Sequence, residues 1–417
     1  MTRDTVVVGG GLAGLVAALR LAQAGRDVAV YAFGHGALPL APAVIDILGY
    51  GPDPVPSPAQ ALPAFLAAHP GHPLGLVGAG ALEAGCAWFT ELAAPLGYSG
   101  SPQRNLWLSS AVGALRPSAL VPETMAAGDL SEGGALLIAG IRGYRDLHPH
   151  LVAGNLAAAG RQAGIRIEAR GVHVSLPGSA SQLRPQLLAR HLEEPSSRQE
   201  LARSIRQELR GEDAVGVPAV LGWRHSHQVW SELQERIGRP VFEIPSLPPS
   251  ISGLRLQALL TRALRHAGGR LVVGAEVVSA SARDGRLMEV TVAESSRRVG
   301  VSARHFVLAT GGVASGGIVV DRGHPAREVI FGLPVGGGDA GEEAAEAYLA
   351  DQPQDRLGLA VDERMRPLGQ DGEPVYTNLH AAGAVLGGAC PWREKSGNGI
   401  SLATGYAAAA AILEESE

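Results

Sequence analysis

The first 32 residues combine a short apolar run, a glycine string and a helical pattern. Residues 4–8 (Asp-Thr-Val-Val-Val) are typical of a buried parallel strand, and residues 28–31 are typical of a second one. Between them, residues 15–24 have the apolar spacing of a helix that ends at Gly25. A strand, a helix and a second strand in this order predict a βαβ unit at the N-terminus.

The same kind of pattern returns in the last third of the chain. A helix is predicted over residues 253–267, because the apolar period is strong there and two glycines close it. Alternating or apolar strands follow, and a final helix closes the chain. Their predicted bounds are residues 270–273, 276–282, 288–293, 305–308 and 379–381 for the strands and residues 398–412 for the helix.

The middle of the chain has a different character. Residues 49–72 are rich in Pro, Gly and Ala and are predicted to form a long loop or linker. Residues 176–213 hold the densest charge and indicate a solvated helical segment. The remaining predicted elements are helices over residues 82–94, 151–163 and 225–237 and strands over residues 165–174, 214–221 and 241–244.

Composition excludes several classes of protein. The 417 residues are 46% hydrophobic and carry a net charge of −5, which excludes a disordered chain and removes the basic footprint of a nucleic-acid binder. Cys86 and Cys390 are the two cysteines and do not form a C-x-x-C motif, so neither an iron–sulfur cluster nor a zinc site is expected on this chain. No apolar run reaches about 20 residues, so we expect a cytoplasmic chain without a membrane span.

The glycine string is the sharpest chemical signal. Gly9 allows the tight turn out of the first strand, Gly11 lets the backbone approach a pyrophosphate, and Gly14 lets helix and strand pack closely. The helix N-terminus then offers unpaired N–H groups to an anion. Because the motif lies between a predicted strand and a predicted helix, it indicates a dinucleotide site.

One element of that motif is missing. An acidic residue at the end of the second strand would bind the ribose hydroxyls, but this chain has Ala32 followed by Phe33. Three explanations stay open: Asp46 replaces the carboxylate, the adenosine is held weakly, or the ligand is not a full dinucleotide. NAD is disfavoured, and both FAD and FMN remain candidates.

Two further glycine segments support a flavin site. Residues 307–312 (Val-Leu-Ala-Thr-Gly-Gly) match the second cofactor segment of flavoproteins with two dinucleotide-binding motifs. Residues 379–388 and 397–399 lead into the last helix, whose N-terminus could face the N1–O2 edge of a flavin. Ala384 stands where an acidic residue usually binds the ribityl chain. The candidate cofactor-binding residues are Gly9, Gly10, Gly11, Leu12, Ala13, Gly14, Gly36, Ala37, Ala309, Thr310, Gly311, Gly383, Gly387, Gly388, Asn398 and Gly399.

Two ionisable residues are candidates for catalysis. His35 lies between two glycines after the second strand, where a histidine could reach a flavin or simply be solvated. Arg255 begins a predicted helix and could clamp a phosphate or form a structural ion pair. His148 and His150 have no carboxylate at a supporting spacing, so we predict no metal site there.

At this point the sequence resembles a known family. The segment Thr5–Leu15 is similar to the fumarate reductase/succinate dehydrogenase flavoproteins, and the whole chain resembles, more narrowly, the B subunits of anaerobic glycerol-3-phosphate dehydrogenases. The segments that carry the narrower resemblance are residues 36–38 with 45–48, 247–257, 314–317 with 327–328 and 332–333, and 361–388.

The resemblance implies a fold and a domain order. It implies an α/β fold with a Rossmann-like flavin-binding domain of the two-dinucleotide-binding flavoprotein type, interrupted by an α+β cap domain. The expected flavin-binding domain comprises residues 1–48 and 246–417, and the expected cap comprises residues 49–245.

The resemblance also implies an activity and partners. The expected protein belongs to a quinone-linked dehydrogenase that oxidises glycerol 3-phosphate to dihydroxyacetone phosphate. The family implies FMN on this chain, with FAD as the alternative, an FAD-containing catalytic subunit and an iron–sulfur subunit as partners, and peripheral association with the inner face of the cell membrane through a partner. A stand-alone fumarate reductase-like oxidoreductase and a non-catalytic scaffold subunit remain alternatives.

Overall fold

The N-terminal βαβ unit forms as the sequence predicts. Strand β1 (Arg3–Val8) pairs in parallel with β2 (Val28–Ala32), and helix α1 (Leu12–Gln23) connects them. All five residues of β2 and the last four of β1 are buried, as expected for parallel strands that are covered on both faces. The computed structural model describes residues 2–176, 183–321, 324–336, 345, 347, 350 and 352–415.

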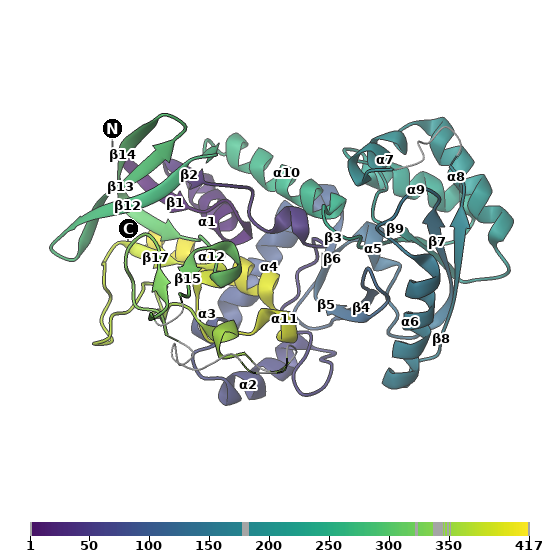
Figure 1. The fold of residues 1–417 in the computed structure, drawn as a ribbon, viewed down its shortest axis with the longest axis horizontal. Helices are drawn as coiled ribbons and strands as arrows, with labels where there is room; N and C mark the ends of the chain where they lie inside the picture. The colour runs from purple at the N-terminus through teal and green to yellow at the C-terminus, as the bar shows by residue number, and fades with distance from the viewer. Residues whose placement is uncertain are drawn as a thin grey trace. The chain divides into compact units, whose positions relative to one another are not determined.

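A seven-stranded sheet is built around this unit (Figure 1). Strand β14 (Arg297–Leu308) belongs to two kinds of ladder, because its first half pairs antiparallel with β13 (Arg286–Glu294) and its second half pairs in parallel with β1. The order β11-β2-β1-β14-β13-β12 is completed by β17 (Leu379–Ala381), which pairs in parallel with β14. The carboxyl ends of five parallel strands therefore lie at one edge, where ligands bind in this architecture.

The chain divides into two compact units. The first unit consists of Met1–Ala37, Ala59–Phe89 and Ala258–Glu417, and the second of Leu38–Pro58 and Thr90–Gln257. The other elements assigned mainly to the first unit are α2 (Pro58–Ala68), α3 (Pro73–Val77), α4 (Ala79–Leu92), β11 (Arg270–Val273), β12 (Glu276–Arg283), η3 (Val313–Ser315), β15 (Ile318–Val319), β16 (Arg327–Glu328), η4 (Pro353–Arg356), η5 (Gly383–Val385), α11 (Pro391–Glu394) and α12 (Gly397–Glu414).

The second unit has a four-stranded parallel sheet in the order β10-β9-β7-β8, with two short antiparallel pairs, β3–β6 and β4–β5. Its core is a cluster of buried Leu, Ile and Val side chains. The elements are η1 (Leu38–Leu40), η2 (Ala94–Leu96), β3 (Tyr98–Gly100), β4 (Leu106–Ser109), β5 (Leu115–Ser118), β6 (Leu120–Pro122), α5 (Glu123–Ala126), β7 (Gly134–Ile141), α6 (Pro149–Ala163), β8 (Ile167–Val174), α7 (Pro185–His191), α8 (Pro195–Glu208), β9 (Ala214–Pro218), α9 (Ser226–Ile237), β10 (Val241–Ile244) and the first half of α10 (Ile251–His266).

The units differ from the predicted domains in three segments, and one of these, residues 246–257, was expected in the flavin-binding domain but lies in the second unit. Residues 38–48, expected with the N-terminal domain, pack in the second unit, because the backbone of Ile45 is hydrogen-bonded to that of Leu120. Residues 59–89, expected in the cap, pack in the first unit, because α4 lies against α12 where Gly85 meets Tyr406. The predicted loop over residues 49–72 is also wrong in part, since it contains helix α2.

Candidate functional site

The glycine loop joins β1 to α1 through close backbone contacts. Gly9 has φ +114°, and a Cβ atom there would lie 2.2 Å from the carbonyl oxygen of Ala309. A Cβ on Gly14 would lie 2.0 Å from the oxygen of Gly9. Only glycine fits at these two positions, and the fit brings the N-terminal motif against the second predicted cofactor segment.

The loop leaves open space at one position. A Cβ on Gly11 would meet no atom within 4 Å, although Gly11 is the N-cap of α1. No side chain caps this helix, and no acidic residue lies in its first turn. The first N–H groups of α1 have no partner within the helix and carry its positive dipole end. This part of the first unit therefore has the donors and the space that a pyrophosphate needs.

The loop after β2 packs on the glycine string. A Cβ on Gly10 would lie 2.9 Å from the Cβ of Ala32, and one on Gly36 would lie 2.7 Å from the Cα of Gly11. Gly36 has φ +65°, whereas His35 and Ala37 beside it are exposed. The structure thus brings Gly36 to the glycine loop and leaves His35 at the surface of the same loop.

The segment after β14 contacts both other glycine segments. Ala309 N–H donates to Val8, and a Cβ on Gly312 would lie 2.5 Å from the carbonyl oxygen of Ala384. Gly311 has φ +81°, and the hydroxyl of Thr310 is buried without a hydrogen-bond partner. Three sequence segments that are far apart in the chain therefore meet at the carboxyl ends of β1 and β14.

The C-terminal segment contacts the first turn of α1 and the start of the site. A Cβ on Gly383, which has φ +81°, would lie 2.8 Å from the Cβ of Ala13, and Gly383 N–H donates to Thr404 Oγ1 of α12 at 2.8 Å. Gly387 and Gly388 have a different role. Their backbone packs against Gly358 and Gly71, so these two glycines allow the loop to pack closely and do not border an open space.

A buried carboxylate supports the start of α12. Glu394 accepts hydrogen bonds from the Cys390 N–H at 2.7 Å and from Ser396 Oγ at 2.8 Å, and it lies 3.2 Å from His72 Nε2. His72 Nδ1 accepts from Leu74 N–H, so Nε2 carries the proton that faces Glu394. Burial alone would raise the pKa of this carboxyl, but the hydrogen bonds of His72, Cys390 and Ser396 outweigh it and hold the pKa below its ordinary value.

This network was not predicted from the sequence. His72 and Glu394 are 322 positions apart, and neither belongs to a motif. Ser396 is the N-cap of α12, and Asn398 and Gly399 lie in its first turn. The network therefore fixes the helix end that carries two of the predicted cofactor-binding residues.

The two missing carboxylates remain missing in the fold. β2 ends at Ala32, and the next residue, Phe33, is 78% exposed. Ala384 lies in η5 beside Gly312. Asp46, which was considered as a replacement for the ribose-binding carboxylate, has other partners. It pairs with Arg116 and accepts a hydrogen bond from Ser118 Oγ at 2.7 Å within the second unit.

Arg255 is held in a buried ion pair of the second unit. Its guanidinium forms a two-pronged pair with Glu243, at 2.7 Å and 3.0 Å, and donates twice to the carbonyl oxygen of Gly222. Glu243 also accepts from Thr124 Oγ1 and from Leu221 N–H. Four of the five N–H groups that an arginine side chain has are used in this way.

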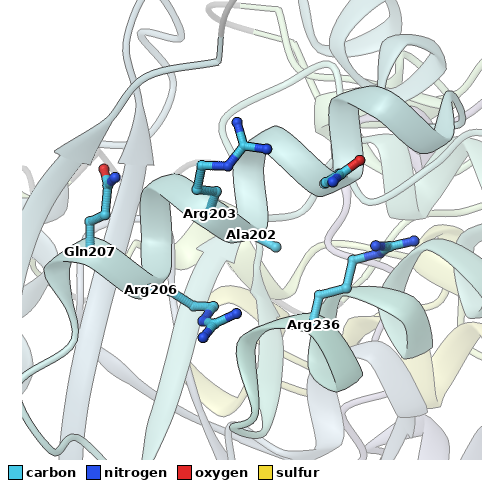
Figure 2. A pocket seen from close by; sticks show the side chains of 6 residues that line it. Ala202, Arg203, Arg206, Gln207 and Arg236 are labelled. Carbon is cyan, nitrogen blue, oxygen red and sulfur yellow. The ribbon is translucent and has the colours of Figure 1, made fainter.

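A separate pocket of about 560 Å³ lies on the second unit (Figure 2). Its lining comes from α8 and α9 and contains none of the predicted site residues. Three of its lining residues are arginines, Arg203 and Arg206 on α8 and Arg236 on α9 (Figure 2).

The comparisons with known proteins agree with the glycine geometry. A family model described as "FAD binding domain" matches residues 4–400. The B subunit of the anaerobic glycerol-3-phosphate dehydrogenase of Pectobacterium atrosepticum is 35% identical, with 100% of this chain and 99% of the relative covered. The probable B subunit of the same enzyme from Halobacterium salinarum is 34% identical, with 99% of this chain and 98% of the relative covered. The B subunit from Vibrio cholerae is 32% identical, with 99% of this chain and 97% of the relative covered. The predicted flavoprotein fold is confirmed.

Within the described part of the chain, none of the helices has the length and apolar character that crossing a bilayer requires.

Proposed function

Because the chain belongs to the family of B subunits of anaerobic glycerol-3-phosphate dehydrogenases, we propose that it is the flavin-carrying subunit of a dehydrogenase that oxidises glycerol 3-phosphate. The observation that carries this proposal is the meeting of three glycine segments at the N-terminus of α1, beside Gly11 with its open space. The family is one of FAD-binding-domain proteins, so the cofactor class is a flavin.

We propose FAD rather than FMN as the flavin. The free N–H groups of α1 and the bare Gly11 suit a pyrophosphate, which FAD has and FMN lacks. The family resemblance implied FMN, and the absence of a carboxylate at Ala32 favours a ligand without adenosine. The open N-terminus of α1 carries more weight, because the loops around it fit together only with glycine at Gly9, Gly14 and Gly36, where a Cβ atom would clash.

The residues of this chain would bind and orient the cofactor. The N-termini of α1 and α12 each present N–H groups that have no partner within their own helix, and Glu394 with Ser396 holds the α12 end in place. A bound flavin would supply hydride acceptance and one-electron transfer. We propose that the chain relays electrons within a complex with an FAD-containing catalytic subunit and an iron–sulfur subunit, and that this complex lies peripherally on the inner face of the cell membrane.

The two candidate catalytic residues receive different roles. His35 is exposed on the loop that packs on Gly11, so it stays the candidate for contact with substrate or flavin. Arg255 is engaged with Glu243 and Gly222, so we propose that it positions the first turn of α10 instead of binding a phosphate.

The experiment begins with the absorbance spectrum of the purified chain and mass spectrometry of the acid-released cofactor. We expect a yellow protein that releases FAD; FMN would overturn the cofactor proposal, and a colourless protein would favour the scaffold alternative. Glycerol 3-phosphate should reduce the flavin only when the FAD-containing catalytic partner is added. Turnover by the isolated chain with an artificial acceptor would instead support the stand-alone oxidoreductase.

A matched pair of variants tests the binding site. Gly11→Ala places a methyl group in the open space beside the α1 N-terminus, and we expect it to lower flavin content at least tenfold without loss of fold. Gly80→Ala is the control, because its Cβ also meets no atom within 4 Å but lies in α4. Equal flavin content in the two variants would contradict the assignment of the pyrophosphate to this loop.

A further inference from the structure

Three potential metal ligands meet at one face of the main sheet. His305 lies on β14, His380 on β17 and Glu415 at the C-cap of α12, and one donor atom of each lies within 4.8 Å of the others. In the parallel ladder His380 pairs with Val307, two residues beyond His305. Because residues two apart in a strand share a face, both imidazoles project from the same side of the sheet.

Two of the three donor atoms are buried nitrogens without a hydrogen-bond partner. The His380 side chain is 0% exposed, and its Nδ1 lies 2.8 Å from the carbonyl oxygen of Arg364. Nδ1 therefore carries the proton, and Nε2 is left as a lone-pair donor with no partner. His305 Nδ1 is likewise buried without a hydrogen bond and lies 3.4 Å from Glu415 Oε2. A buried lone pair such as that of His380 Nε2 is rarely left unsatisfied in native proteins.

We propose that His305, His380 and Glu415 bind a divalent transition-metal ion of the zinc class. Imidazole and carboxylate donors suit zinc, and a tetrahedral site with zinc–nitrogen bonds of about 2.1 Å has donor atoms about 3.4 Å apart. The His305–Glu415 separation already has this value. A water molecule would take the fourth position.

Arg364 gives His380 and Glu415 the outer contacts that metal ligands usually have. Its carbonyl oxygen fixes the His380 tautomer, and its Nη2 lies 3.3 Å from Glu415 Oε1, which leaves Oε2 for the ion. The guanidinium also repels a cation, so this site should bind more weakly than a four-ligand structural zinc site.

The ion would tie the last turn of α12 to two strands of the sheet. The same helix carries Thr404, whose hydroxyl accepts a hydrogen bond from Gly383 N–H, and its N-cap Ser396 donates to Glu394. A bound ion would therefore stabilise the helix that supports the glycine segments. The cysteine-based expectation of no zinc site does not address this cluster, because its donors are two histidines and a glutamate from three distant segments.

The test uses the full chain after treatment with EDTA and removal of the chelator. Titration with Zn²⁺ should show one ion per chain by native mass spectrometry and a rise in Tm of several degrees. His380→Gln and Glu415→Gln should each lower Zn²⁺ affinity at least tenfold. Co²⁺ in place of Zn²⁺ should give the visible absorption of a tetrahedral site, and this absorption should be absent in His380→Gln.

Control variants separate this site from adventitious surface binding. His150 lies beside His173 in the second unit, with ring centroids 5.5 Å apart, and His150→Gln should bind Zn²⁺ like the wild type. Glu415→Gln alters a side chain that is 19% exposed, so it should fold even where His380→Gln does not. Unchanged affinity in Glu415→Gln, a loss in His150→Gln, or no stoichiometric binding by the wild type would each overturn the proposal.

Discussion

At the residue scale, the structure gives Arg255 a structural environment in place of the phosphate contact that its sequence position suggested. Arg255 was a candidate phosphate clamp because of its place at the start of a helix. In the fold it is 7% exposed, and its partner Glu243 is 2% exposed. A buried pair of this kind costs desolvation, and the loss of one partner leaves the other as an uncompensated charge.

Arg255→Met should therefore act on stability. We expect the free energy of unfolding to fall by about 3–5 kcal/mol, because Glu243 stays buried without its counter-ion. The double variant Arg255→Met/Glu243→Met should recover part of this loss. Urea denaturation measures both, and flavin content per folded chain should not change. A variant of full stability that has lost activity would support the catalytic role instead.

A second residue-scale prediction concerns Glu394. Its folded pKa lies below the ordinary 4.5, because hydrogen bonds outweigh the effect of burial. A depressed carboxyl pKa contributes stability above the unfolded pKa, and this contribution is lost as the pH falls through the folded pKa. Glu394→Gln should cost about 2 kcal/mol at pH 7, and the difference from the wild type should shrink below pH 4.5.

Urea denaturation at several pH values measures how the stability difference between Glu394→Gln and the wild type changes with pH. Glu168→Gln is the matched control, because Glu168 pairs with Arg166 at the surface, where the two side chains are 60% and 88% exposed. Exposed pairs of this kind contribute little, so the control should show no measurable change. A difference that grows as the pH falls would contradict the assignment of a stabilising charge to Glu394.

At the element scale, the crossing of α1 and α12 determines the shape of the proposed flavin site. A Cβ on Gly405 would lie 2.5 Å from the carbonyl oxygen of Ala13. The sequence of α12 has no charged residue before Glu414, as expected of a helix that is buried on most sides. The close approach is possible only because Gly405 and Ala13 are small.

Gly405→Ala should push the two helices apart. Overpacking of this kind costs about 1–3 kcal/mol, and the better helix propensity of Ala returns up to about 1 kcal/mol. We expect a net loss of stability together with lower flavin content, because the first turn of α1 moves. Gly80→Ala again serves as control and should be neutral or slightly stabilising in thermal denaturation. A Gly405→Ala protein with normal flavin content would show that the site tolerates this shift.

The elements also show how far the sequence could be interpreted. Strands β10, β11 and β17 have the predicted bounds, because turn residues or polar segments flank short apolar runs. Helix α2 was missed, because its prolines suggested a loop; yet Pro58 stands at the first position, where no N–H is needed. The glycine segments were found because each motif is local. The hydrogen-bond network of Glu394 and the cluster of His305, His380 and Glu415 were not predicted, because only the fold brings their members together.

At the scale of the whole molecule, the predicted cofactor motifs and the candidate catalytic Arg255 belong to different compact units. The predicted cofactor-binding residues all lie in the first unit, and Arg255 lies in the second. A ligand that binds the glycine segments should protect their amides most strongly, because it takes up the N–H groups that the helix leaves unpaired.

Hydrogen exchange on flavin-loaded and flavin-depleted chains tests this division. Loading should slow exchange at the first turn of α1 and at residues 310–312, with a smaller effect or none in strand β7 of the second unit. The buried β7 provides an internal reference, because its exchange depends on opening of the sheet in the second unit. Equal protection of β7 and α1 would mean that the flavin acts on the stability of the whole chain. Protection of β7 alone would place the flavin away from the glycine segments and overturn the site.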